Sequence, residues 1–230
     1  MQASPTTRCA IDMTTTTIFL RDVMDTDSSL RPSVSGWGHY QGSLTATRMR
    51  RMIEEQENHD TTIILSLAGV KRMDVSYLME LLLLIRQWRF RHNVCLVNLA
   101  DRDLRLNWDA TAKCLRQPLF SWDDDTQNFY MLGYYPRLGL RNILQFVLAT
   151  ARWTSATDVA EALDLPIGAA AGKLKQLWFD GYIQCLQQLP SQERAASNGN
   201  TEDDAFVYRR IAPPVGDSTS QYNMQRPISC

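Results

Sequence analysis

Two continuous runs of β-prone apolar residues, 63–67 and 94–99, lie on either side of a long apolar segment in the first half of the chain. Such runs are typical of parallel strands that are covered on both faces. The segment between them follows Asp74, whose carboxylate can cap a helix that extends to about residue 91. The pattern therefore predicts a strand–helix–strand crossover, which is right-handed in nearly all sheets.

The flanking segments extend this alternation of strands and helices. Residues 18–23 predict a first strand, and the glycine-broken segment 33–38 predicts a second one. Residues 44–58 carry a modest apolar stripe at helical spacing, and Ser43 can cap that helix. Asp101 can cap another helix after the second buried run. Together these elements predict an α/β fold built with right-handed crossovers.

The helix predicted over 75–91 is apolar around most of its circumference, and Leu83 and Leu84 flank its narrow polar stripe. A helix that only covers a sheet needs an apolar face of about 100°. This helix should therefore pack against the sheet and against a second partner, either another domain of the chain or another molecule. The predicted partner-binding residues at this helix are Asp74, Ser76, Leu83, Leu84 and Gln87. For Asp74 and Ser76, a phosphate or partner site stands against the simpler alternative of a helix cap with a solvated serine.

The composition changes between residues 118 and 136, where an acidic loop precedes an aromatic strand, and this change predicts a junction between two domains. The remainder predicts three helices and two paired strands. Ser155 or Thr154 can cap the second helix, with Asp158 completing a Ser-x-x-Asp capping box, and Gly181 ends the third helix. The predicted organisation is a flexible N-terminus (1–16), an α/β domain (17–117), the junction (118–136), a second domain (137–212) with a flexible insert at 190–204, and a disordered tail (213–230).

Composition and charge exclude several classes of function. The formal net charge is −1 and the pI is about 6.3, so any contact with nucleic acid would need a local basic patch. The five cysteines are widely spread, which favours reduced thiols in the cytoplasm over disulfides or zinc. No apolar segment reaches the length that spans a membrane, and no signal peptide is evident. No nucleophile elbow, phosphate loop or metal-ligand spacing is present, so we expect no enzyme activity, catalytic residue, metal or cofactor.

Residues 63–109 resemble the STAS family, the anti-sigma-factor-antagonist type of module. The similarity rests on the strand at 63–67, the Gly69-Val70 turn, the Met73-Asp74-x-Ser76 segment and the second buried strand. This resemblance implies a small domain with a mixed sheet and helices largely on one side, which acts by binding proteins. Members often carry a phosphorylatable serine directly after the aspartate. Here that position is Val75, so the phosphoswitch is expected to be absent.

Residues 138–211 resemble a winged helix–turn–helix domain through the turn at 160–166, the Leu174/Leu177 spacing and the exit at 179–183. Many such domains bind DNA with the third helix in the major groove and a basic wing on the backbone. Eight basic and eight acidic residues lie between positions 137 and 210, so the predicted domain has no net positive charge. The candidate DNA contacts are Lys173, Lys175, Gln176, Arg209 and Arg210.

These features lead to a first hypothesis of a cytoplasmic transcription regulator, in which a STAS-like domain docks a protein partner and a winged helix domain contacts double-stranded DNA. The alternative is a non-enzymatic adaptor that binds proteins, or a second copy of itself, through the helix at 75–91 and does not bind DNA. In a third interpretation, the STAS-like half holds a small anion or a lipid.

Overall fold

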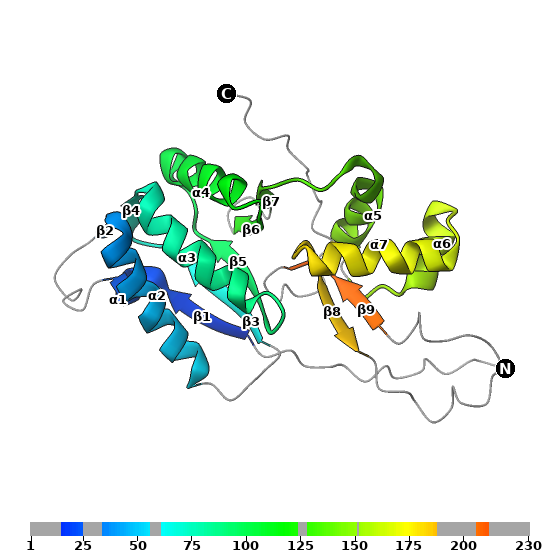
Figure 1. The fold of residues 1–230 in the computed structure, drawn as a ribbon, viewed down its shortest axis with the longest axis horizontal. Coiled ribbons are helices and arrows are strands. Elements are labelled where there is room, and N and C mark those ends of the chain that lie inside the picture. Colours follow the sequence, from blue (N-terminus) through cyan, green and yellow to red (C-terminus); the bar gives the residue numbers. More distant parts are fainter. Residues whose placement is uncertain are drawn as a thin grey trace.

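The computed structural model describes residues 15–24, 34–55, 61–123, 128–150, 152–187 and 206–211. Within these ranges the chain forms a mixed α/β fold around a five-stranded sheet in the order β1-β3-β5-β6-β7 (Figure 1). Its strands are β1 (Thr15–Phe19), β3 (Thr61–Ser66), β5 (His92–Val97), β6 (Pro118–Asp123) and β7 (Asn128–Gly133). The first four run parallel, and β7 is antiparallel to β6. The predicted α/β class and the buried crossover strands are therefore confirmed.

Four helices and a small second sheet occupy the connections between the parallel strands. The helices are α1 (Leu20–Met24), α2 (Gly38–Glu54), α3 (Val75–Trp88) and α4 (Arg102–Cys114). The short strands β2 (Val34–Gly36) and β4 (Val70–Met73) pair in parallel beside the main sheet. Asp101 caps α4 by accepting a hydrogen bond from the Leu104 N–H at 2.8 Å, which confirms the predicted cap.

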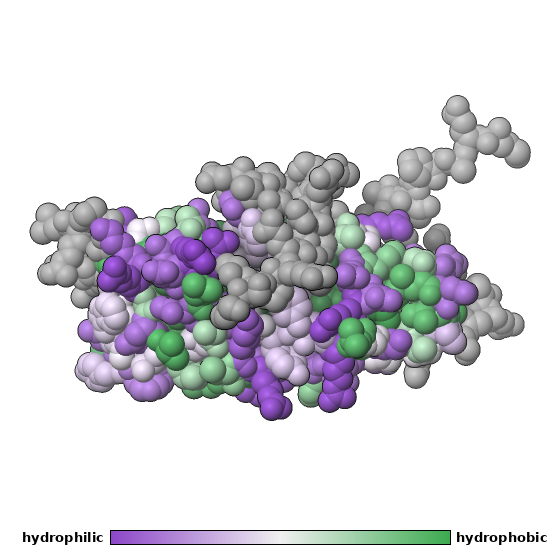
Figure 2. Space-filling model, turned by 90° about the horizontal axis from the view of Figure 1, so that it is seen from above, coloured by the Kyte–Doolittle hydropathy of each residue, from purple (hydrophilic) through white to green (hydrophobic). Residues whose placement is uncertain are grey.

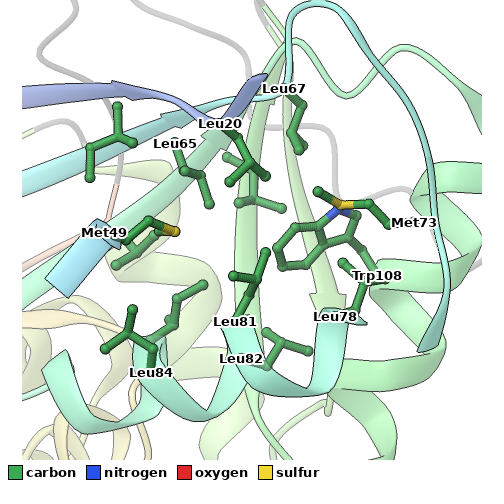
Figure 3. Packing of buried hydrophobic residues seen from close by; sticks show 14 of the residues in the cluster. Leu20, Met49, Leu65, Leu67, Met73, Leu78, Leu81, Leu82, Leu84 and Trp108 are labelled. Atoms are coloured by element: carbon green, nitrogen blue, oxygen red, sulfur yellow. The ribbon is translucent and has the colours of Figure 1, made fainter. Parts of the chain in front are cut away.

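Side chains that alternate along the strands divide the core into two clusters. The first cluster joins Leu65 and Leu96 of the sheet to α2, α3 and α4, and Figure 3 shows Leu81 and Leu84 of α3 extending into it beside Met49. All three crossovers move in the same direction across the sheet. Because crossovers have a fixed hand, such a sequence of moves puts every long connecting helix on one face.

The opposite face of the sheet carries a second row of apolar residues. Ile64 pairs with Cys95, Cys95 with Phe120, and Phe120 with Met131. These four side chains are buried in the second cluster together with apolar residues from beyond residue 138. At the edge strand β1 this cover ends, and Phe19 is 52% exposed. The C-terminal part of the chain therefore completes the core of the sheet from β3 to β7.

We call residues 138–187 and 206–211 the C-terminal unit. It contains α5 (Leu138–Ala149), α6 (Ala156–Leu163), α7 (Ile167–Phe179), β8 (Gln184–Gln187) and β9 (Phe206–Arg209), and it lies to the right in Figure 1. The predicted Ser155–Asp158 capping box is confirmed, and β8 and β9 pair in antiparallel fashion as predicted. Gly181 has a φ of +86°, and the Tyr182 N–H donates to the Leu177 carbonyl, so α7 ends in a Schellman motif.

Several predicted boundaries are wrong. The strand predicted over 18–23 ends at Phe19, where α1 begins. Helix α2 begins at Gly38, and Ser43 lies inside it instead of capping it. The first turn of α2 is satisfied from elsewhere, because the Gly38 N–H donates to Asp74, and such a cap leaves no local sequence signal. Gly69 forms the predicted turn, but Val70 then starts β4.

The segment predicted as a junction, 118–136, contains β6 and β7 and thus belongs to the main sheet. Its aromatic residues Phe120, Trp122 and Phe129 are buried because they face the C-terminal unit. The predictions for most of the N-terminus (1–14), the acidic loop (124–127), the polar insert (190–204) and the tail (213–230) lie outside the described residues.

Candidate functional site

Asp74 joins the beginnings of two helices. Its Oδ1 accepts a hydrogen bond from the Tyr77 N–H at 2.7 Å, as expected for the N-cap of α3. Its Oδ2 accepts a second bond from the Gly38 N–H of α2 at 2.9 Å. Ser76 lies half-buried in the first turn of α3. Because both carboxylate oxygens are bonded to backbone, the geometry accounts for Asp74 as a double helix cap.

The second partner of the apolar helix α3 is α2 of the same chain. Glu80 Oε1 lies 3.1 Å from His39 Nδ1, and Gln87 Oε1 accepts from Arg50 Nη2 at 2.8 Å, so α2 follows the polar stripe of α3. Leu84 is only 2% exposed, and the prediction that it contacts a partner is wrong because it packs in the first cluster (Figure 3). Leu83, at 38% exposed, and Gln87 remain at the surface.

The α2–α3 contact depends on a small residue and a buried hydroxyl. A Cβ atom at Gly42 would lie 2.7 Å from the Tyr77 carbonyl oxygen, so the two helices approach each other closely. The Tyr77 hydroxyl donates to Thr45 Oγ1 at 2.7 Å. Burial raises the pKa of Tyr77 to about 12, while the Thr45 hydrogen bond and the Arg48 charge oppose this shift. The phenol is therefore neutral and structural.

Helix α7 presents a surface of small and polar residues to solvent. Gly168, Ala169 and Gly172 are exposed, and a Cβ at either glycine would meet no atom within 4 Å. Lys175 and Gln176 are also exposed, whereas Lys173 is half-buried. The predicted DNA contacts on α7 are therefore accessible to different degrees, beside a strip where the backbone can be approached closely.

The strand β9 lies beside Lys175 of α7 through Phe206, and the arginine that follows β9 is buried. Lys175 Nζ lies 5.9 Å from the ring centroid of Phe206, and Arg209 is half-buried. Arg210 is 4% exposed, and its Nη1 donates to the Leu148 carbonyl at 3.5 Å. The prediction of Arg210 as a DNA contact is wrong, because this side chain turns inward against α5. Its burial lowers the pKa of the guanidinium.

The basic and acidic residues between positions 137 and 210 balance, with eight of each in the sequence. Four of these acidic residues, at positions 193 and 202–204, and one basic residue, Arg194, lie outside the described residues. In the described part of 137–211, seven basic residues (Arg137, Arg141, Arg152, Lys173, Lys175, Arg209 and Arg210) stand against four acidic ones (Asp158, Glu161, Asp164 and Asp180). On the face shown in Figure 2, hydrophilic and hydrophobic residues are intermixed.

Two surface features were missed from the sequence. Trp37, Tyr40 and Leu44 form an exposed apolar row at the start of α2, and Tyr40 is 78% exposed. A cavity of about 60 Å³ also lies where the amino-terminal ends of β5 and β6 meet the C-terminal unit. Arg86, Arg89 and Arg116 line this cavity. The row could have been found from its i, i+3, i+7 spacing, but the arginines converge only through the fold.

The described residues contain no group of three or more metal-ligating side chains, and none of the helices among them is long and apolar enough to cross a membrane. Cys95, Cys114 and Cys185 form no disulfide within the described part of the chain. Burial raises the pKa of Cys185 to about 11, so this thiol is protonated at neutral pH and is a poor nucleophile.

Comparison with protein-family models, curated proteins and solved structures finds no match for this chain.

Proposed function

We propose that this protein is a non-enzymatic transcription regulator in which the C-terminal unit is a winged helix that contacts DNA. The observation that carries the proposal is the open outer side of α7. Gly168 and Gly172 leave space beside the helix, and Lys175 and Gln176 lie exposed on the same element. A helix with this surface can enter a groove and let its backbone approach the phosphates closely.

The order of elements supports the same proposal. Helices α5, α6 and α7 precede the paired strands β8 and β9, which is the order of a winged helix. Lys175 lies beside Phe206 of β9, so the third helix and the wing can present basic groups together.

We further propose that the α/β unit is STAS-like and docks a protein partner. Its helices cover one face of the sheet, and Asp74 starts α3 at the position where the resemblance was found. Val75 is 45% exposed at the position after the aspartate, where many STAS domains carry a phosphorylatable serine. Docking by this unit would therefore operate without that switch.

The test is fluorescence anisotropy of mixed-sequence duplex DNA titrated with the full chain at several salt concentrations. Binding should weaken steeply as salt rises, because phosphate contacts release counterions. Replacing Lys175 by glutamate should weaken binding by about tenfold and reduce the salt slope by about one. Lys71→Glu makes the same charge change at an exposed position of β4 and serves as the matched control. Absence of binding at low salt, or equal losses in both variants, would refute the DNA proposal.

A second candidate function, a protein-binding adaptor, is favoured by the exposed row of Trp37, Tyr40 and Leu44. Exposed aromatic side chains aligned on one helix are typical of protein interfaces. If the full chain binds no DNA but self-associates in sedimentation experiments, Tyr40→Asp should reduce that association. Leu83→Asp on α3 is the comparison, and a larger effect of this variant would move the interface to α3.

A further inference from the structure

The cavity at the joint between the sheet and the C-terminal unit has an unusual balance of charge. Its walls come from the end of α3, the starts of β5 and β6, and the turn after α7. Arg86, Arg89 and Arg116 line it, and Asp180 is the one carboxylate among its lining residues. We call this cavity the arginine pocket.

The three guanidinium groups form no ion pair with a carboxylate of the described residues. Among the described residues, no aspartate or glutamate lies within ion-pair distance of Arg86, Arg89 or Arg116. Asp180 instead accepts a hydrogen bond from Gln176 Nε2 at 2.8 Å. Arginines are favoured at the end of a helix such as α3, but Arg116 reaches the cavity from beyond α4. The helix dipole of α3 therefore does not explain their convergence.

The guanidinium group of Arg89 lies against two aromatic rings, and its Nε–H donor has no hydrogen-bond acceptor among the described residues. Its guanidinium carbon lies 4.6 Å from the ring centroid of Phe90 and 5.5 Å from that of Phe179. Its Nε is buried and has no hydrogen-bond partner within the described part of the chain. Burial lowers the pKa of Arg89 and the charge of Arg86 lowers it further, while the charge of Asp180 opposes both effects, so a bound anion would add to the favourable effect of Asp180.

Gln117 adds an acceptor to the same cavity. This residue is 9% exposed, and its Oε1 is buried without a partner among the described residues. The pocket thus offers guanidinium donors and one carbonyl oxygen that can accept a hydrogen bond. Hydrogen phosphate matches both, since it is an anion that retains a hydroxyl group near neutral pH, whereas sulfate has no such hydroxyl.

We propose that the arginine pocket binds a phosphate-class oxyanion, in which Arg86, Arg89 and Arg116 hold the charged oxygens and Gln117 accepts a hydrogen bond from a phosphate hydroxyl. The ligand is free hydrogen phosphate, because the second pKa of a phosphomonoester is about 6 and such an ester has mostly lost its phosphate hydroxyl near neutral pH. Since neither Lys175 nor the open side of α7 lines the pocket, this site does not depend on DNA binding.

The test is isothermal titration calorimetry of the full chain with sodium phosphate, with sodium sulfate and adenosine monophosphate as separate arms at matched ionic strength. Phosphate should bind one to one, and sulfate should bind at least about tenfold more weakly, because Gln117 would face an oxygen without a proton. Adenosine monophosphate is mostly a dianion without a phosphate hydroxyl near neutral pH, so it should bind about as weakly as sulfate. Binding of adenosine monophosphate as tight as that of phosphate would overturn the proposed role of Gln117.

Variants separate a built site from a general salt effect. Arg86→Gln alters an exposed position of α3 and should weaken phosphate binding about tenfold, and Arg89→Gln should do the same. Arg51→Gln changes an exposed arginine of α2, serves as the matched control, and should bind phosphate as tightly as the parent does. Lys175→Glu should also retain phosphate binding. Absence of saturable phosphate binding, equal binding of sulfate, or unchanged binding in both pocket variants would overturn the proposal.

Discussion

Replacing Asp74 by alanine should destabilise the protein more than replacing Asp101 by alanine. Both aspartates are N-caps and accept one bond from their own helix, at 2.7 Å from Tyr77 and 2.8 Å from Leu104. Asp74 accepts a further bond from Gly38 at 2.9 Å, which holds the first turn of α2. The two substitutions therefore differ by one backbone hydrogen bond that joins distant segments.

The expected magnitudes follow from these contacts. Loss of an aspartate cap costs about 1 kcal/mol, which is the whole expected effect of Asp101→Ala. Loss of a hydrogen bond to a charged acceptor adds about 1.5 kcal/mol, so Asp74→Ala should cost roughly 2–3 kcal/mol. For a chain of this size, that loss lowers the melting temperature by about 5–10 °C. The loss of stability in Asp74→Asn should fall between those in Asp101→Ala and Asp74→Ala, because the amide nitrogen of asparagine cannot accept a hydrogen bond from the Gly38 N–H.

Urea unfolding followed by circular dichroism measures these differences as shifts of the midpoint at constant slope. Ser76→Ala is the control, since Ser76 lies beside the cap and should change stability by less than about 0.5 kcal/mol. If Asp74→Ala is no more destabilising than Asp101→Ala, the bond to Gly38 contributes nothing. If Asp74→Ala instead leaves stability intact and impairs capture of a partner, the double-cap interpretation is wrong.

Two more predictions concern the α2–α3 contact. Gly42→Ala should destabilise the protein by about 1–3 kcal/mol, although alanine has the better helix propensity, because the new Cβ atom meets the Tyr77 backbone. In the same denaturation assay, Gly172→Ala should stabilise the protein by about 0.5–1 kcal/mol, because a Cβ atom at this position of α7 meets no other atom. If both alanines stabilise, the helices are not in tight contact. Tyr77→Phe should cost about 1–2 kcal/mol at pH 7 by leaving the Thr45 hydroxyl without its donor. The free energy of unfolding of the parent should also fall between pH 10 and 12, because the phenol of Tyr77 ionises first in the unfolded chain while burial keeps its folded pKa at about 12. In Tyr77→Phe, the slope of the free energy of unfolding against pH should be smaller by about 1.4 kcal/mol per pH unit in this range. An unchanged slope would contradict the raised pKa of Tyr77.

The parts of the fold that were predictable from sequence are those with local signals. The run at 63–67 identified a strand buried on both faces, and Ser155 with Asp158 identified a helix start. The start of α2 was missed because its cap comes from Asp74, 36 residues away in sequence. The strands β6 and β7 were assigned to a junction because their aromatic residues gave no indication of which surface would cover them.

The candidate site was less predictable than the fold, because the exposure of its residues depends on segments that are distant in the sequence. Exposure of Lys175 and Gln176 followed from the helical pattern of α7, but burial of Leu84 and Arg210 depends on α2 and α5. The apolar circumference of α3 indicated a second partner, but the prediction that this partner is another domain or another molecule is wrong, because α2 of the same unit covers the helix. Helical periodicity reports that a surface is covered and carries no information about which segment covers it.

Helix α7 connects the two proposals made for this chain. Its C-terminal end is fixed at the joint, where Trp178 and Phe179 lie 6.1 and 5.6 Å from Phe90 between ring centroids. Its N-terminal half carries the open glycines that are proposed to face DNA. Phosphate in the arginine pocket would lie beside Asp180 and Gly181 at the C-terminal end of α7, where its negative charge can shift the orientation of α7 relative to the sheet. Saturating phosphate should therefore change DNA affinity in the parent but not in Arg89→Gln, and an unchanged affinity in the parent would show that the two sites act independently.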